Sequence, residues 1–427
     1  METSNSTGAT LIIGNCQAGV QLATTLRELG DAAPIVLVGE ESYLPYQRPA
    51  LSKAFLKGEA TAASLTFRTE EWFDQQGIEL VTGEEIVDIS RGTDGGTAVG
   101  VSGRVFPFTR LALTTGAAPR KLPLAGAEME GVCYLRDADQ AASLHSLLGK
   151  ARSVAVIGGG FIGLEVATAA RAAGKQVTII EAAPRLVGRA VAETTSDFYL
   201  WAHRRRGTTV LLNAEIVRIA GEDGRVTGVE LAQGPTVPAE VVVIGVGVLP
   251  RTELAERLGL EVSNGVVVDS SAVASDGVTV AAGDCANMPN PFVADYGSGN
   301  VRLESVQNAV EQAKTAARSL LGLEAEYRTV PWFWSDQGDL KLQIAGLSAG
   351  HDSTVLRGDP ESERFSVLYY REGRIIAADC VNTPRDFMAV RNALAQGMDI
   401  PPDANLARDS KNQWFPGYPP EVTNQMP

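Results

Sequence analysis

The sequence contains few cysteines and few histidines. Its 427 residues include four of the former and three of the latter: Cys16, Cys133, Cys285, Cys380, His145, His203 and His351. No two cysteines have the C-x-x-C or C-x4-C spacing, and each histidine is isolated in the sequence. Zinc sites and disulfide frameworks need such clusters, so we expect neither a bound metal nor structural disulfides.

Long apolar runs and an excess of basic charge are also missing. No apolar run reaches the roughly 20 residues that a membrane-spanning helix needs. The first ten residues, METSNSTGAT, lack the basic start and apolar centre of a signal peptide. The 51 acidic residues outnumber the 37 basic ones, and the net charge of −14 argues against bulk attraction to nucleic acid or anionic membranes. We expect a cytoplasmic protein without a nucleic-acid or membrane partner.

Glycine is abundant, with 44 residues, and its spacing marks a first candidate nucleotide site. In residues 11–26, LIIGNCQAGVQLATTL, an apolar run predicts a buried strand and the later apolar pattern predicts a helix. Gly14 and Gly19 occupy the outer positions of the G-x-G-x-x-G fingerprint. Cys16 occupies the middle position, where glycine normally lets the backbone approach a pyrophosphate. The turn alone leaves three interpretations: a working site, a broken site or a redox cysteine.

A second copy of this pattern is complete. Residues 153–185, SVAVIGGGFIGLEVATAARAAGKQVTIIEAAPR, predict a strand at 154–157, a helix that ends at residue 173 and a second strand at 177–180. The turn between them contains Gly158, Gly160 and Gly163. Such a turn places backbone N–H groups and a helix N-terminus against a pyrophosphate.

Each copy also ends in an acidic residue. Glu181 follows Gly158 by 23 positions and Glu40 follows Gly14 by 26, where a carboxylate can accept hydrogen bonds from a ribose diol. Two such units, 144 residues apart, predict two bound nucleotides, and the alternative is two α/β turns that bind nothing. Glu181 favours NADH over NADPH because an acid repels a 2′-phosphate. The nearby arginines at positions 185 and 189 soften this preference.

Six further segments occur in a fixed order. They are YLPYQRPALSK (43–53), LTTGAAPR (113–120), VGVLP (246–250), AAGDCA (281–286), RLESVQNAVEQAK (302–314) and VPWFWSDQGDLKLQIAG (330–346). With these segments, the chain resembles the FAD-dependent ferredoxin reductases of bacterial oxygenase systems from about residue 10 to about residue 395. The resemblance implies an α/β fold on the glutathione-reductase-like plan. It has two Rossmann-like domains, for FAD and NAD, and a C-terminal α/β interface domain.

The segments also divide the chain. We expect a discontinuous FAD-binding domain in residues 1–118 and 248–328, an NAD-binding domain in 119–247 and a C-terminal domain with an extended tail in 329–427. Within the last part, FSVLYYREGRIIAADCV (365–381) predicts a β-hairpin that turns at positions 372 and 373, and residues 384–395 predict a helix. The tail after residue 400 is rich in Pro, Asn and Asp, and we expect it to be extended or loosely ordered.

The first glycine turn and the resemblance together imply a candidate FAD site. It consists of Gly14, Ala18, Gly19, Glu40, Arg48, Lys53, Ile86, Arg136, Asp284 and Val306. Asp284 follows a predicted strand at 278–282, where a short acceptor suits ribityl hydroxyls. Val306 opens a predicted helix, whose positive end would stabilise the negative charge of a reduced flavin.

The candidate NAD site lies around the second turn. It consists of Gly158, Gly160, Phe161, Ile162, Gly163, Glu165, Glu181, Arg189 and Gly247. The resemblance places Lys53 beside flavin N5, and a buried Lys53–Glu165 pair would hold both cofactors where hydride passes. The alternative is an ordinary salt bridge between domains. Trp334, which the resemblance places near the isoalloxazine, completes the candidate catalytic set, whereas Trp332 is expected in the core.

The cysteines bear on the electron route. In related flavoproteins, disulfide reductases carry a C-x4-C pair and peroxide-reducing enzymes a single cysteine in the first FAD segment, but this chain has none between Cys16 and Cys133. Electrons from reduced FAD would therefore leave one at a time to an external carrier. No resolving cysteine is near Cys16 in the sequence, so we interpret it as a tolerated departure, with weakened FAD retention as the main risk. Arg251, where the family often has Asn, is a second departure and affects the expected NAD-side contacts.

The leading hypothesis is an NADH:ferredoxin reductase. Hydride would pass from NADH to FAD, and single electrons to a small ferredoxin of the two-iron two-sulfur type that feeds a haem monooxygenase or a Rieske oxygenase. The alternatives are a rubredoxin reductase, an NADH oxidase or, from another class, a redox-sensing binding protein like apoptosis-inducing factor. We expect a monomer or a weak homodimer. Because ferredoxins are usually acidic, we also expect a basic rim near the flavin, with Arg48, Arg302 and Lys314 as candidates.

Overall fold

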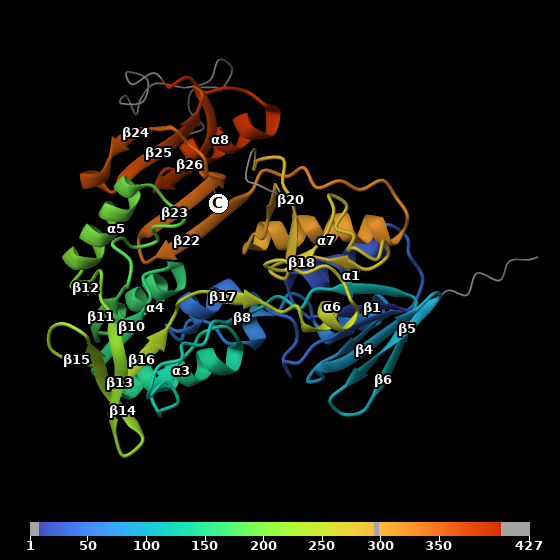
Figure 1. The fold of residues 1–427 in the computed structure, drawn as a ribbon, viewed down its shortest axis with the longest axis horizontal. Coiled ribbons are helices and arrows are strands. Elements are labelled where there is room, and N and C mark those ends of the chain that lie inside the picture. The colour runs from blue at the N-terminus through green and yellow to red at the C-terminus, as the bar shows by residue number, and fades with distance from the viewer. Residues whose placement is uncertain (1–7, 294–298, 403–427) are drawn as a thin grey trace, which may run out of the picture.

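The computed structural model describes residues 8–293 and 299–402. Figure 1 shows three units: a first unit at the right, a second unit at the lower left and a C-terminal unit at the upper left. Most of the tail that was expected to be extended, from residue 403 onward, lies outside the described residues.

The first unit is built from two separate stretches of chain. The first contributes β1 (Thr10–Ile13), α1 (Gln17–Glu28), β2 (Ile35–Val38), α2 (Glu70–Gln75), β3 (Ile78–Val81), β4 (Ile86–Gly92), β5 (Gly95–Gly100), β6 (Val105–Phe108), β7 (Arg110–Leu113) and β8 (Ala117–Pro119). The second contributes β17 (Val248–Pro250), α6 (Glu253–Arg257), β18 (Val266–Val267), β19 (Val280–Ala281), β20 (Ala286–Pro289), β21 (Asn300–Val301) and α7 (Val306–Leu320). Its parallel sheet has the order β19-β7-β1-β2-β3, so a strand from the second stretch completes a sheet begun by the first.

The second unit repeats this plan. Its elements are β9 (Val132–Cys133), α3 (Ala138–Lys150), β10 (Ser153–Ile157), α4 (Phe161–Ala172), β11 (Gln176–Ile180), α5 (Glu193–Arg205), β12 (Thr209–Leu211), β13 (Ile216–Glu222), β14 (Arg225–Leu231), β15 (Val237–Pro238) and β16 (Val241–Ile244). The parallel sheet has the order β12-β11-β10-β16-β9. In both units a three-stranded antiparallel sheet, β4–β6 or β13–β15, is inserted before the last strand of the repeat, β7 or β16. The two predicted strand–turn–helix–strand units are confirmed.

The C-terminal unit is an antiparallel sheet covered by one helix. It contains β22 (Trp332–Gln337), β23 (Leu340–Gly346), β24 (Ser353–Asp359), β25 (Arg364–Arg371), β26 (Arg374–Val381) and α8 (Pro384–Gln396), with the strand order β22-β23-β26-β25-β24. The predicted hairpin is confirmed, because Glu372 and Gly373 form its turn with φ of 52° and 76°. The predicted helix is also confirmed, with one more residue than expected.

Strand pairing and apolar packing both join the units. The chain leaves the first unit through β8 and returns through β17, and these strands pair antiparallel, with Leu249 opposite Ala118. Leu340 and Leu342 of the C-terminal sheet belong to one buried apolar cluster with Leu164 of α4. The second and C-terminal units therefore share a core.

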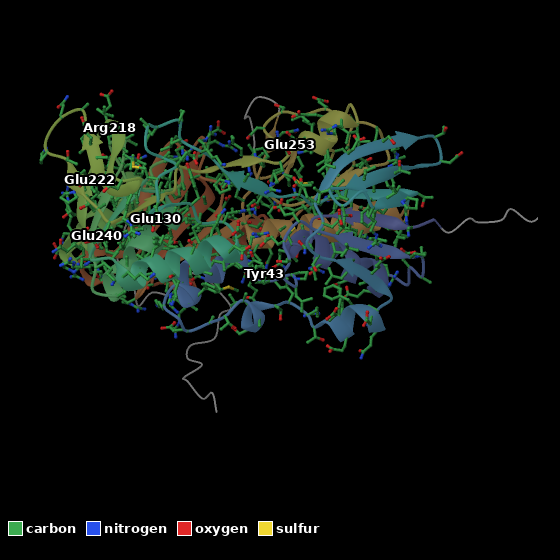
Figure 2. All side chains as sticks on the ribbon, turned by 90° about the horizontal axis from the view of Figure 1, so that it is seen from below. Tyr43, Glu130, Arg218, Glu222, Glu240 and Glu253 are labelled. Atoms are coloured by element: carbon green, nitrogen blue, oxygen red, sulfur yellow. The ribbon has the colours of Figure 1, made fainter. Side chains whose placement is uncertain are left out.

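Surface charge is strong at the far end of the second unit. Figure 2 labels Glu130, Arg218, Glu222 and Glu240 there, well separated from Tyr43 near the middle of the molecule. Arg218 pairs with Glu230 at 2.6 Å in this region, and both side chains are exposed, so the pair adds little stability.

No helix in the described part of the chain is long and apolar enough to cross a membrane.

Asp379 is a buried acid at the junction of the second and C-terminal units. Its side chain on β26 accepts hydrogen bonds from Ala192 N and Thr195 Oγ1, both at 3.0 Å, and from the Tyr369 hydroxyl. Burial raises the pKa of Asp379 to about 6, from an ordinary value of 3.8. The folded chain therefore holds a proton that the unfolded chain releases between about pH 4 and pH 6. The stability that this proton contributes is full below pH 4 and is lost as the pH rises through 6.

We expect Asp379→Asn to flatten the pH dependence of stability. Between pH 5 and pH 7.5 the free energy of unfolding of the parent chain should fall by roughly 1 kcal/mol more than that of the variant. Urea unfolding at the two pH values measures this difference. Asp88→Asn, at an exposed position, is the control and should follow the parent chain. Equal slopes for Asp379→Asn and the parent would contradict the assignment.

Candidate functional site

The outer glycines of both turns are required by the backbone. Gly14 has φ of +116°, and a Cβ added there would lie 2.1 Å from the carbonyl oxygen of Thr114. Gly158 has φ of +105°, and its added Cβ would lie 2.4 Å from the carbonyl oxygen of Gly245. A Cβ on Gly19 would lie 2.1 Å from the Gly14 carbonyl oxygen, and a Cβ on Gly163 would lie 2.2 Å from the Gly158 carbonyl oxygen. No other residue fits these positions without a shift of the backbone.

The middle position accepts a side chain. Cys16 has φ of −112° and forms the N-cap of α1, while Gly160 forms the N-cap of α4 with φ of −81°. A Cβ on Gly160 would meet no described atom closer than the Gly245 oxygen at 4.0 Å. In the first turn Cys16 Sγ donates to the carbonyl oxygen of Thr114 at 3.1 Å. The turn therefore keeps its geometry with a cysteine, as the interpretation of a tolerated departure requires.

The other cysteines offer no partner for a redox role. All four cysteines are free. Burial raises the pKa of Cys133 to about 11 and also raises the pKa of Cys285 and Cys380. A thiol with a raised pKa is a poor nucleophile at neutral pH.

No group of His, Cys, Asp and Glu among the described residues could hold a metal ion.

A cavity of about 300 Å³ lies beside the first turn. Its wall combines that turn, the segment from Glu40 to Lys53, the start of α4, the start of α7 and β22. The predicted site residues on the wall are Ala18, Glu40, Arg48, Lys53, Arg136, Phe161, Ile162, Glu165, Asp284, Val306 and Trp334. Residues of all three units thus meet around one cavity.

Other predicted residues lie beside this wall or apart from it. Gly14, Gly19 and the second turn (Gly158, Gly160 and Gly163) shape the backbone, as described above. Glu181 lies next to the second turn, where its carboxylate accepts hydrogen bonds from Gly159 N at 2.5 Å and Ala183 N at 2.7 Å. The Arg189 guanidinium lies 3.9 Å from the position of a Cβ on Gly247. The side chain of Ile86 is buried in the core of the first unit, so that a contact with a nucleotide would have to come from its main chain.

The cations on the cavity wall are paired with acids. The pairs are Arg48–Glu41, Lys53–Glu165 at 2.7 Å, Arg136–Asp284 at 2.9 Å and Arg251–Glu40 at 2.6 Å. Sequence reasoning proposed the second pair and missed the other three. The expected basic rim is not supported, since Arg302 pairs with Glu304 and Lys314 pairs with Glu311.

Glu165 accepts hydrogen bonds from two of the three units. Its side chain on α4 is 2% exposed. One oxygen, Oε2, accepts from Lys53 Nζ at 2.7 Å and Ser52 Oγ at 2.5 Å, while Oε1 accepts from Ser335 Oγ at 2.7 Å. Ser52 and Lys53 lie in a single π-helical turn (Leu51–Phe55), and Ser335 follows Trp334 on β22. Sequence reasoning missed both serines, although each is adjacent to a predicted site residue.

The aromatic cluster on β22 divides between core and cavity. Trp332 packs edge-on against Phe387 of α8 at 5.8 Å and belongs to the periphery of the C-terminal core, as expected. Trp334 lines the cavity, and Phe333 lies 4.7 Å from Phe161 at the start of α4. The ring contacts fix the end of α4 that carries Glu165.

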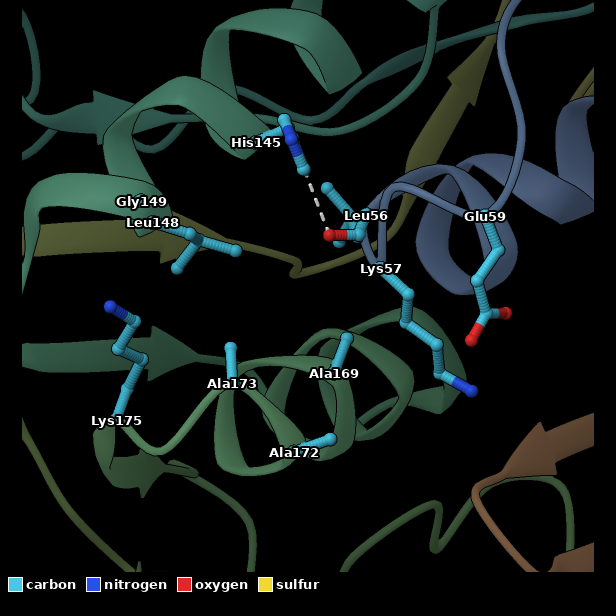
Figure 3. Close-up of a pocket in the computed structure, with 10 residues that line it drawn as sticks. All are labelled: Leu56, Lys57, Glu59, His145, Leu148, Gly149, Ala169, Ala172, Ala173 and Lys175. Carbon is cyan, nitrogen blue, oxygen red and sulfur yellow. Dashed lines mark hydrogen bonds between the residues drawn. The ribbon is translucent and has the colours of Figure 1, made fainter.

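A second cavity is not the candidate site. Figure 3 shows it between the outer face of α4, α3 and the segment around Leu56. Its volume is about 360 Å³, and its wall contains three alanines together with His145, Lys57 and Lys175. His145 Nδ1 bonds the Leu56 carbonyl at 2.9 Å, which serves packing. None of the predicted site residues lines it.

The first cavity fits a dinucleotide. The N-terminus of α1 has no side-chain cap, whereas α3 and α7 are capped by Asp137 and Ser305. An uncapped first turn presents free N–H groups, which bind a pyrophosphate. Ala18 and Asp284 lie on the same wall and leave room and an acceptor for the rest of such a ligand. The N-terminus of α4, also without a side-chain cap, offers the same arrangement at the second turn.

Two Rossmann-type units, each with a glycine turn, define the class of two-nucleotide flavoproteins. The model of the family described as pyridine nucleotide-disulphide oxidoreductase matches residues 8–313, and the one described as reductase C-terminal matches residues 332–412. The chain belongs to the pyridine nucleotide-disulphide oxidoreductase family, whose members bind FAD and use NAD(P)H.

Relatives narrow this class. The chain is 44% identical to rhodocoxin reductase of Rhodococcus erythropolis over 393 residues, which cover 92% of this chain and 91% of that protein. It is 38% identical to a rubredoxin-NAD(+) reductase of Pseudomonas putida over 377 residues, 88% of this chain and 96% of the other. Its fold matches the crystal structure of the covalent putidaredoxin reductase–putidaredoxin complex with a TM-score of 0.90 at 36% identity, covering 95% and 97% of the two chains.

The place of Glu181 predicts its effect on nucleotide choice. Because its carboxylate lies at the N–H of Gly159 within the second turn, we expect Glu181→Ala to lower the affinity for NAD⁺ about tenfold and to narrow the preference for NAD⁺ over NADP⁺. Titration of the oxidised protein with NAD⁺ and NADP⁺ measures both. Glu193→Ala, outside the turn, should leave both affinities unchanged. An unaltered NAD⁺ affinity in Glu181→Ala would show that this acid does not read the ribose.

Proposed function

We propose that this protein is an NADH:ferredoxin reductase that serves an oxygenase. Residues 1–118 and 248–328 would bind FAD, residues 119–247 would bind NADH, and the C-terminal part from residue 329 would cover the junction. We further propose a two-iron two-sulfur ferredoxin as partner, a monomer or weak homodimer, and action in the cytoplasm, where NADH is supplied.

One observation carries this proposal: the Lys53–Glu165 pair joins the wall of the first cavity to the helix that begins at the second glycine turn. A nucleotide at each turn would therefore meet near this pair. Bound FAD supplies the chemistry, since it accepts a hydride as a pair of electrons and releases the electrons singly.

The chain's own residues would orient and shield this meeting point. Lys53 and Glu165 hold each other in one geometry, and Ser52 and Ser335 donate one further hydrogen bond each to the carboxylate. Trp334 and Phe333 line the side formed by β22 and would exclude water there once the cofactor is bound. With the pKa of the buried thiols raised, single-electron delivery to an external carrier fits the site better than thiol reduction does.

The test is an anaerobic visible spectrum of the purified protein before and after addition of NADH or NADPH. We expect the flavin bands to bleach faster with NADH than with NADPH. We also expect cytochrome c to be reduced only when a two-iron two-sulfur ferredoxin is added. A protein that does not take up FAD would overturn the proposal. Transfer to rubredoxin but not to ferredoxin would favour the rubredoxin reductase alternative, which the 38% identical relative keeps open. Rapid oxygen consumption without a carrier would favour the NADH oxidase.

A further inference from the structure

Arg251 is the second residue, with Cys16, at which this chain departs from the expected pattern. It follows β17 where the chain re-enters the first unit. Its backbone N–H donates to the Gly116 carbonyl at 3.0 Å, and its own carbonyl accepts from Thr115 Oγ1 at 2.8 Å. Its guanidinium lies against Glu40, with 2.6 Å between Arg251 Nη1 and Glu40 Oε2. The sequence predicted that Arg251 affects the contacts with NAD, whereas in the structure its guanidinium contacts Glu40, the acid that follows the first glycine turn.

The balance of charges on the cavity wall indicates what the contact between Arg251 and Glu40 does. Four cations and six acids line the cavity: Arg48, Lys53, Arg136, Arg251, Glu40, Glu41, Asp137, Glu165, Asp284 and Glu304. Each of the four cations is within an ion pair, so that none is surplus. A dinucleotide adds the two negative charges of its pyrophosphate. Without Arg251 the Glu40 carboxylate would be unpaired in a cavity whose wall already carries more acids than cations, and it would repel an incoming dianion.

The ion pair is not explained by a need for fold stability. The side chains of Arg251 and Glu40 are 35% and 38% exposed, and exposed pairs contribute little to folding. Both side chains line the same cavity as Cys16. Cys16, which replaces the middle glycine of the turn, and the Arg251 guanidinium therefore lie on the wall of one cavity.

We propose that Arg251 is a FAD-retention residue. It neutralises Glu40 at the adenosine end of the site, so that the carboxylate binds the ribose without repelling the pyrophosphate. In this way it offsets the looser approach of the backbone at Cys16. This inference rests on the proposed function, because it takes the first cavity as the FAD site.

The test is the dissociation constant of FAD, measured by fluorescence titration of the apoprotein. We expect Arg251→Asn to raise it at least about tenfold, the change that 1.4 kcal/mol produces. The double variant Arg251→Asn with Glu40→Gln should regain most of this loss, since the unpaired charge is gone. Arg251→Lys should lose less than Arg251→Asn. Arg257→Asn, which breaks an exposed ion pair with Asp88 nearby, is the matched control and should bind FAD like the parent chain.

Two results would overturn the inference. One is an unchanged FAD dissociation constant in Arg251→Asn, and the other is a double variant that binds no better than Arg251→Asn alone. The affinity for NAD⁺ should stay unchanged, and a selective loss of NAD⁺ binding would move Arg251 to the NAD side. If the parent chain itself takes up no FAD, the proposed function is wrong. If the parent chain binds FAD and Arg251→Asn binds it with the same dissociation constant, only the role of Arg251 is wrong.

Discussion

Glu165→Gln is expected to slow flavin reduction by NADH about 100-fold and to lower the free energy of unfolding by about 3 kcal/mol. The stability loss arises because Lys53, whose side chain is only 19% exposed, would keep its charge without an opposite charge beside it. The kinetic loss arises because the carboxylate holds groups from all three units, and small displacements of reacting groups have large effects on rate. Stopped-flow absorbance under anaerobic conditions and urea unfolding measure the two quantities.

A second variant separates the two roles. Lys53→Met combined with Glu165→Gln removes both charges, and replacing a buried ion pair by uncharged groups often restores stability. If the pair acts in hydride transfer, the double variant should recover stability while flavin reduction stays slow. If both stability and reduction rate recover, the pair is an ordinary salt bridge between units. Ser335→Ala should give a smaller loss in both measurements, since the ion pair remains.

Gly14→Ala is expected to abolish FAD binding, while Cys16→Ala two residues away should leave the protein yellow. The first change places a methyl group 2.1 Å from the Thr114 carbonyl oxygen at φ of +116°, so the turn must move. Backbone strain of this kind costs about 1–3 kcal/mol, and the overlap with the Thr114 oxygen adds to it, so the affinity for FAD should fall by at least about 100-fold. The second change occurs at a negative φ and removes only one weak hydrogen bond from Sγ.

The visible spectrum of each purified variant and its FAD content measure the effect. Cys16→Gly tests the cost of the natural departure, since it should bind FAD a few times more tightly than the parent chain. A colourless Cys16→Ala would show that the thiol itself takes part in binding. A yellow Gly14→Ala would show that the turn can relax, and the proposed site would need a different geometry.

The sequence predicted the fold well because its signals are local. Each glycine turn lies between a buried strand and a helix within about 30 residues, and the hairpin at Glu372 and Gly373 is set by two adjacent residues. The resemblance supplied the order of the units. Strand limits differed by one or two residues, as for the strand expected at 278–282, of which Val280–Ala281 is paired.

The side-chain pairs of the site could not be predicted in the same way. Arg251 and Glu40 are 211 positions apart, and Ser335 and Glu165 are 170 apart, so no local pattern relates them. The expectation of a basic rim failed for the same reason, because sequence shows the sign of a charge and not its partner. The expected effect of Arg251 on NAD-side contacts followed from the family pattern, whereas its guanidinium contacts Glu40, the acid that follows the first glycine turn.

The discontinuity of the first unit has a consequence for biosynthesis. Its parallel sheet needs β19 next to β7, and α1 packs against α7, so the unit lacks an edge strand and a covering helix until about residue 320 has left the ribosome. The second unit, whose sheet draws only on residues 132–244, is complete much earlier. Domains generally fold as they emerge. The inserted unit should therefore fold first on the nascent chain. The first glycine turn should be unable to retain its cofactor until β19, the strand that completes its sheet, has been synthesised.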